Sequence, residues 1–204
     1  MWDNATTMMV VEGIFVTLYM TLATTFMGYV LGLPMGIALV ITAPKGLRPN
    51  KIIYKVLDVV VNVVRSFPFL ILLIVIQPLT RIIVGKSYGP TATIVPLTLS
   101  AAPFIARMVE SSLLEVDHGV IEAAQSMGAN LWTIGEAKTS LIVNVTIALG
   151  TILGYSAMAG IVGGGGLGDI AIRYGYYRYD SSIMWVTVVL LIVLVQLMQY
   201  VGMK

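Results

Sequence analysis

Charged residues divide the chain into long apolar segments. Uncharged runs cover residues 13–44, 66–80, 87–106, 139–168 and 181–203. A helix needs about 20 apolar residues to cross the hydrocarbon core of a bilayer. Four runs reach that length, whereas the 15-residue run 66–80 needs residues from before it. The pattern predicts five transmembrane helices, at about 14–42, 57–79, 88–109, 140–161 and 182–203.

The composition also indicates an integral membrane protein. Hydrophobic residues make up 58% of the chain and charged residues 11%, with a mean hydropathy of +0.93, whereas soluble domains carry about 25% charged residues. We therefore expect an all-α membrane protein with a single domain, residues 1–204. The chain has no Cys and one His, which excludes disulfides and metal sites rich in Cys or His. Its Lys and Arg are scattered, so nothing indicates a nucleic-acid partner.

Basic residues predict the orientation. Lys45, Arg48, Lys51 and Lys55 follow the first run within eleven residues, and the positive-inside rule places such a loop in the cytoplasm. The N-terminus is then outside and the C-terminus cytoplasmic. In that topology eight Lys and Arg lie inside and four outside.

The first run contains small residues at regular spacing. Gly28, Gly32 and Gly36 recur every four residues, with Pro34 among them. They would permit a kink or close packing against a neighbouring helix. Tolerated small residues that face lipid are an equally good explanation.

The longest polar insertion is the loop at about 117–139. Apolar residues within it recur at steps of three and four, which predicts a short amphipathic helix on either side of Gly128. Asp117 could cap the first helix and Asn130 the second. The apolar stripe needs a partner surface, and the alternative is that it lies on the bilayer.

The pattern Glu122-Ala123-Ala124, three residues, then Gly128 resembles the permease subunits of binding-protein-dependent ABC importers. In that family this loop is the coupling element that docks in a groove of the ATPase. The resemblance implies a type I ABC importer permease architecture, and it implies that these four residues couple the chain to the ATPase. Lys138-Thr139-Ser140-Leu141 departs from the Ile-x-Leu-Pro of the family.

Three further segments, 65–69, 95–110 and 154–168, are similar to the methionine-type permeases of the family. They supply candidates for the pathway or gate, namely Tyr155, Ser156 and Met158, because a flexible Met could form a deformable plug that meets its copy in a second subunit. The alternative is that Met158 only fills apolar space. Arg65 is a structural or gating candidate, or simply a side chain that snorkels to the interface.

The glycine-rich segment after the fourth run formally matches a dinucleotide-binding pattern. Gly163, Gly165 and Gly168 have the spacing G-x-G-x-x-G. That pattern requires a preceding strand and a following helix in a βαβ unit, and here it follows a membrane helix. We therefore reject a nucleotide site in this chain.

The resemblance also implies partners. Five spans are few for a solute pathway, so we expect a homodimer, with two ABC ATPase subunits on the cytoplasmic side and an extracytoplasmic substrate-binding protein. ATP and Mg would be bound by the ATPase, so we expect this chain to have no cofactor and no enzymatic activity. The expected location is the bacterial inner membrane, with lipid around the chain.

The expected function is ATP-driven import of methionine, as the L- and D-forms, by alternating access. Two alternatives stay open. One is an importer permease for another amino acid or small solute, and the other is an oligomeric channel without an ATPase. The loop from Glu122 to Gly128 distinguishes the importer hypotheses from the channel, because a channel needs no docking element.

Overall fold

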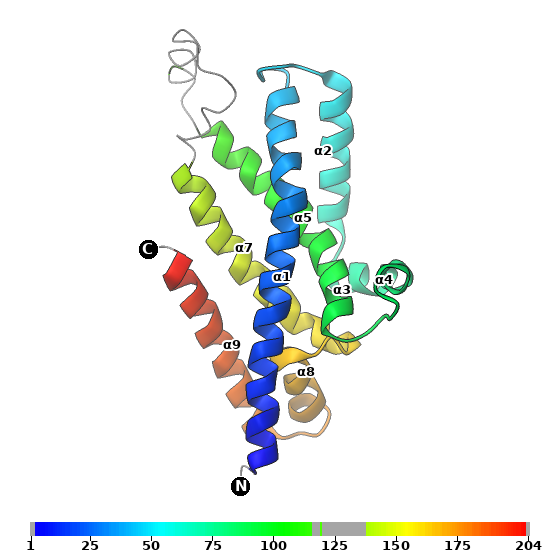
Figure 1. Ribbon diagram of the computed structural model, residues 1–204, viewed down its shortest axis with the longest axis vertical. Helices are drawn as coiled ribbons and strands as arrows, with labels where there is room; N and C mark the ends of the chain where they lie inside the picture. Colours follow the sequence, from blue (N-terminus) through cyan, green and yellow to red (C-terminus); the bar gives the residue numbers. More distant parts are fainter. Residues whose placement is uncertain (1–2, 116–118, 120–137, 203–204) are drawn as a thin grey trace.

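The computed structural model describes residues 3–115, 119 and 138–202, and its elements are helices. Figure 1 shows their arrangement. In chain order they are α1 (Asn4–Thr42), α2 (Lys51–Ser66), α3 (Phe69–Val75), α4 (Gln77–Val84), α5 (Pro90–Leu114), α7 (Lys138–Met158), the 3-10 turn η2 (Ala159–Val162), α8 (Gly166–Ile170), the π-helical turn η3 (Ala171–Tyr176) and α9 (Ser181–Gly202).

Four of the predicted spans are single helices in the described part of the chain. Helices α1, α5 and α9, and α7 with its continuation through η2, are long and apolar enough to cross a membrane. Their ends follow local signals. Asp3 caps α1 by accepting a hydrogen bond from the Asn4 N–H, and α7 ends before the glycine run that was predicted to stop it.

The predicted second span, 57–79, is not one continuous helix. Helix α2 starts earlier, at Lys51, where Asn50 accepts hydrogen bonds from the N–H groups of Ile52 and Ile53. It ends at Ser66, and α3 leaves it at an angle of 101°. Pro68 explains the break, because it lacks an N–H and holds Phe67 in an extended conformation. The span is therefore bent.

Helices α1 and α5 form the tightest interface. Gly28, Gly32 and Gly36 lie on the α1 face that meets α5, and a Cβ at Gly32 would come within 2.5 Å of the Ala102 carbonyl oxygen. The glycines of the first span therefore serve close packing, and they do not face lipid. Pro34 lies inside α1 without ending it.

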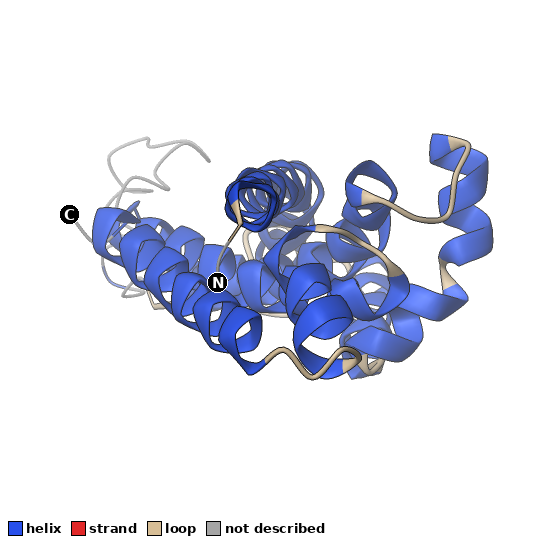
Figure 2. Cartoon of the chain, turned by 90° about the horizontal axis from the view of Figure 1, so that it is seen from below, coloured by secondary structure: helices blue, strands red, loops and turns tan. Residues whose placement is uncertain are grey.

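The core lies between α1, α5 and α7. One cluster contains Ile105 and Val109 of α5 with Ala148 and Ile152 of α7. Peripheral helices bury much less. Val61 is the only buried residue of α2, and α9 buries only two side chains among its described residues. Viewed from the end that carries the N-terminus, α1 is seen almost end-on, while α9 lies at the edge of the bundle (Figure 2).

After η2 the glycine run reverses the chain. Gly163 and Gly165 have φ values of 72° and 85°, which favour glycine. The turn brings α8 against α1, where the Leu167 N–H donates a 2.9 Å hydrogen bond to Thr17 Oγ1. Thr17 in turn donates to the Gly13 carbonyl at 2.8 Å. The buried hydroxyl of Thr17 thus joins α1, near the start of the chain, to α8, near its end.

Candidate functional site

The predicted coupling residues Glu122, Ala123, Ala124 and Gly128 lie outside the described residues. The structure does describe where the loop leaves and re-enters the bundle. Ser140 of α7 donates a 2.7 Å hydrogen bond to Glu115 Oε2 at the end of α5. We use the name loop base for this contact together with the contacts of Asn144 described next.

Asn144, one turn further along α7, completes the loop base. Its side-chain amide donates to the Met108 carbonyl oxygen at 2.9 Å and also to Ser112 Oγ. Leaving a side-chain amide without hydrogen bonds in an apolar environment costs free energy, and separating α7 from α5 would do this. These bonds therefore hold the two helices together. One signal in the sequence could have indicated this contact, since Asn144 is a strongly polar residue within an uncharged run.

The gate candidates occupy the last turn of α7. The Tyr155 ring stacks on Phe69, with 4.6 Å between centroids and 10° between planes. Ser156 is buried, and its hydroxyl donates to the Leu153 carbonyl at 2.7 Å, within its own helix. Met158 is 47% exposed. The structure therefore brings Tyr155 into the core of the chain and leaves Met158 facing outward.

Phe69 is a contact that sequence reasoning did not identify. It is the first residue of α3, directly after the bend at Pro68, and it belongs to a buried cluster with Met20, Leu97 and Ala159. Its segment was noted for its similarity to methionine-type permeases, yet the partner of its ring lies 86 residues away in α7. The stack ties the bent α3 to the predicted gate.

Arg65 lies on the exposed side of α2, near its end. In the part of the chain that the structure describes, it makes no ion pair. Asp58 and Asn62, earlier in α2, contact Arg107 of α5, and Arg65 takes no part in these contacts. Its gating role stays a prediction.

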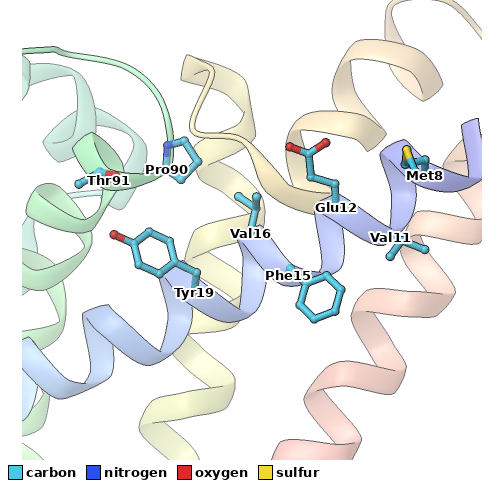
Figure 3. A pocket seen from close by; sticks show the side chains of 8 residues that line it. All are labelled: Met8, Val11, Glu12, Phe15, Val16, Tyr19, Pro90 and Thr91. Carbon is cyan, nitrogen blue, oxygen red and sulfur yellow. The ribbon is translucent and has the colours of Figure 1, made fainter. Parts of the chain in front are cut away.

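A shallow groove of about 600 Å³ runs along the first half of α1 and the start of α5. Phe15, Val16 and Tyr19 line it together with Pro90, and Glu12 supplies one carboxylate (Figure 3). None of Tyr155, Ser156 and Met158 lines this groove. The predicted gate residues are therefore not part of the groove lining.

The segment between α7 and α9 carries aromatic and basic side chains. Arg178 lies over the Tyr174 ring, 4.6 Å from its centroid, and Arg173 pairs with Asp169. Burial raises the pKa of Asp169, and the Arg173 guanidinium opposes part of that rise. Tyr176, Tyr177 and Tyr179 are exposed. The segment can serve as an interfacial belt or as a docking surface for a partner protein.

Comparison with known proteins decides the family. Residues 28–201 match the family described as binding-protein-dependent transport system inner membrane component. The chain belongs to this family. The resemblance inferred from the loop and the three segments is thereby confirmed.

Individual members of the family are similar over most of the chain. The probable D-methionine transport system permease protein MetI of Vibrio cholerae is 53% identical over 192 residues, covering 91% of this chain and 85% of that protein. The D-methionine transport system permease protein MetI of Escherichia coli K12 is 48% identical over 158 residues, covering 74% of this chain and 73% of that protein.

Solved structures confirm the fold of this family member. An inward-facing structure of the MetNI methionine ABC transporter matches with a TM-score of 0.95 and 46% identity, covering 98% of this chain and 96% of that one. An amino acid ABC transporter with histidines matches with a TM-score of 0.71 and 21% identity, over 98% of this chain and 99% of that one, which shows a shared fold. The predicted type I permease architecture is confirmed.

Proposed function

We propose that this chain is the permease subunit of an ATP-driven importer that moves methionine, as the L- and D-forms, across the bacterial inner membrane. The observation that carries the proposal is similarity along the whole chain to proteins named for methionine transport. It reaches 53% identity with a MetI permease and a TM-score of 0.95 with a methionine ABC transporter.

The proposed orientation places the N-terminus outside and the C-terminus in the cytoplasm. The basic connection between α1 and α2 and the loop base lie at the same end of the molecule (Figure 1). Lys45 and Arg48 are exposed at that end. An excess of basic residues favours the cytoplasmic side, so this end would face the ATPase.

In the proposed assembly two copies of the chain form the permease. Two ATPase subunits bind the 117–139 loops and hold ATP and Mg, and a binding protein delivers methionine outside. The outward-facing Met158 suits contact with its copy in the other subunit. The chain itself would then need no cofactor.

The loop base offers a route from the ATPase to the gate. Glu115 and Asn144 tie α5 to α7 where the loop begins and ends, so a displacement of the loop would move both helices. Helix α7 has 21 residues, which corresponds to about 30 Å at the usual rise per residue. Its other end carries Tyr155 and Met158. Rigid helices that transmit small displacements are a common basis of alternating access.

The test is uptake of labelled methionine into proteoliposomes that hold this chain, its ATPase and its binding protein, with and without ATP. We expect accumulation that requires ATP and is reduced by unlabelled D- and L-methionine. Binding-protein-dependent ATP hydrolysis without methionine uptake would favour an importer for another solute. Uptake that is indifferent to ATP would favour a channel.

A variant tests the gate within the same assay. Met158→Ala should let ATP hydrolysis continue while less methionine is retained per ATP, because the side chain that closes the pathway is shortened. Met8→Ala is the matched control, since Met8 is an exposed methionine of α1 and is not among the gate candidates. Unchanged retention in Met158→Ala would contradict the plug.

A further inference from the structure

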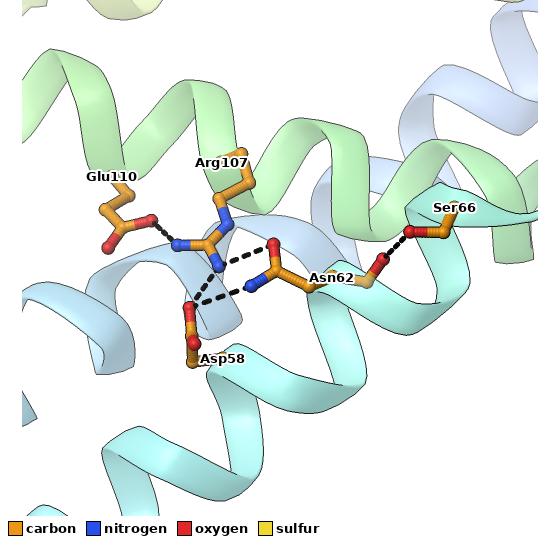
Figure 4. Close-up of polar contacts among 5 residues, drawn as sticks. All are labelled: Asp58, Asn62, Ser66, Arg107 and Glu110. Carbon is orange, nitrogen blue, oxygen red and sulfur yellow. Dashed lines mark hydrogen bonds and ion pairs between the residues drawn. The ribbon is translucent and has the colours of Figure 1, made fainter.

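A cluster of polar side chains joins α2 to α5 (Figure 4). Arg107 of α5 donates to Glu110 Oε2 at 2.6 Å and to Asn62 Oδ1 of α2 at 2.9 Å, and it also pairs with Asp58 of α2. The Asn62 amide donates to Asp58 Oδ1 at 3.2 Å. We call these four residues the Arg107 clasp.

The three charged side chains of the clasp are partly shielded from solvent, whereas Asn62 is exposed. Exposed fractions of the side chains are 20% for Arg107, 10% for Glu110 and 32% for Asp58. Charges removed from water need partners with good geometry, and the planar guanidinium can serve two carboxylates and an amide at once. Lys could not reproduce that arrangement of donors.

The clasp supplements a thin apolar contact. Helix α2 buries a single side chain, Val61, which packs with Leu39 of α1 and Ala106 of α5. Much of the remaining α2 surface is exposed, including Ile52, Val56 and Val63. Tyr54 and Leu57 of α2 are partly buried beside this cluster. Apolar contacts have no directional preference, so by themselves they would let α2 slide on α5. The directional bonds of the clasp fix the register of the two helices.

The position of the clasp connects the loop base with the gate by a second route. Arg107 lies eight residues before Glu115, or about 12 Å along the helix axis. Helix α2 continues through the bend into α3, whose Phe69 stacks on Tyr155. The loop base, α5, the clasp, α2, α3 and Tyr155 thus form a continuous series of contacts and chain connections among the described residues.

We propose that Arg107 is a positioning residue for transport, and that its clasp makes α2 and α3 follow α5 when the coupling loop is displaced. The proposal rests on the proposed function. It assigns to the clasp a role in coupling, measured as methionine transported per ATP hydrolysed, beyond its contribution to stability.

The experiment uses the complete complex in proteoliposomes. In the triple variant Asp58→Asn, Arg107→Met, Glu110→Gln all charges of the clasp are removed together, so no carboxylate is left unpaired. We expect assembly with the ATPase to persist and the methionine transported per ATP to fall at least about fivefold. Lys55→Met is the matched control, because Lys55 is an exposed basic residue of α2 that makes no ion pair among the described residues, and it should leave the ratio unchanged.

A covalent link tests whether the connection between α2 and α5, and not the charges themselves, sets the methionine transported per ATP. The chain contains no Cys, so Val61→Cys and Ala106→Cys introduce one defined pair within the α2–α5 contact. Joining them by a disulfide or a short thiol linker in the triple variant should restore the ratio to within about twofold of the parent.

Several results would overturn the proposal. A parental ratio in the triple variant would do so, and so would a linked triple variant that stays uncoupled. If the triple variant fails to assemble, Arg107→Lys provides the test, because it keeps the charge but loses the planar donors, and an unreduced ratio would refute the clasp. The proposed function is tested separately, by methionine uptake in the parent complex. The clasp proposal is tested only by comparing the methionine transported per ATP in each variant with the parent value.

Discussion

The packing of α1 on α5 predicts a large effect from a small change, Gly32→Ala. A Cβ at Gly32 would lie 2.5 Å from the Ala102 carbonyl oxygen and 2.9 Å from both Cβ and Cγ2 of Ile105. Favourable contacts between carbon atoms occur at about 3.5–4.0 Å. None of these three atoms belongs to the far end of a flexible side chain, so the two helices must separate by roughly 1 Å.

The cost follows from that separation. Moving packed surfaces apart by about 0.5–1 Å loses a quarter to a half of each contact energy, and overpacking of cores costs about 1–3 kcal/mol. Gly28 and Gly36 contact α5 on the same stripe, so the loss extends beyond one residue. Alanine also favours a helix over glycine by about 0.5–1 kcal/mol, which opposes the steric term.

A matched control accounts for the helix preference of alanine over glycine. Gly154 is also inside a helix, and a Cβ there meets nothing within 4 Å, so Gly154→Ala gains only the helix preference. The assay is the unfolding midpoint of the detergent-solubilised chain. Gly32→Ala should unfold below Gly154→Ala by about 2–12 °C, from 1–3 kcal/mol at roughly 2–4 °C per kcal/mol for a chain of this size. Equal midpoints would refute the close-packing argument.

Three further variants test other contacts. Thr17→Val should destabilise the chain by about 1–3 kcal/mol in denaturant unfolding, because the Leu167 N–H loses its acceptor; Thr21→Val, which loses only a bond within its own helix, is the control. Phe69→Ala should destabilise by about 3–5 kcal/mol, whereas Phe69→Tyr, which keeps the stack, should cost less. Glu122→Ala should weaken copurification with the ATPase, and an unchanged complex would mean that Glu122 is only a solvated helix residue.

The membrane spans were the most predictable part of this chain. Long uncharged runs are dictated by the cost of placing charge in hydrocarbon, so α1, α5, α7 and α9 could be located from the sequence. The second span was different. Pro68 predicts a break in the helix. The direction of the 101° bend depends on the buried cluster in which Phe69 packs, and no local sequence pattern determines that position.

The candidate site was predictable only where its residues are neighbours in sequence. Asp58 and Asn62 have the i, i+4 spacing of one helical face, yet their partner Arg107 lies more than 40 residues further on. Phe69 and Tyr155 likewise come from separate helices. Packing selects such pairs from many that are equally compatible with the sequence. The glycine spacing of α1 presented the same limit, since it defined a face and not the helix that covers it.

The polar groups within the spans lead to a final prediction about substrate selection. An amino acid carries two charges that need partners when they leave water. In the described helices Arg107 and Glu110 are engaged in the clasp, Asn144 in the loop base and Thr17 with α8. The buried hydroxyls without a partner there, which include Thr24 and Thr98, are neutral. We therefore expect the binding protein to select the solute. Thr24→Val and Thr98→Val should each leave the methionine concentration for half-maximal uptake within about twofold of the parent value. A tenfold rise in that concentration, equivalent to about 1.4 kcal/mol, would show that the permease itself holds the substrate.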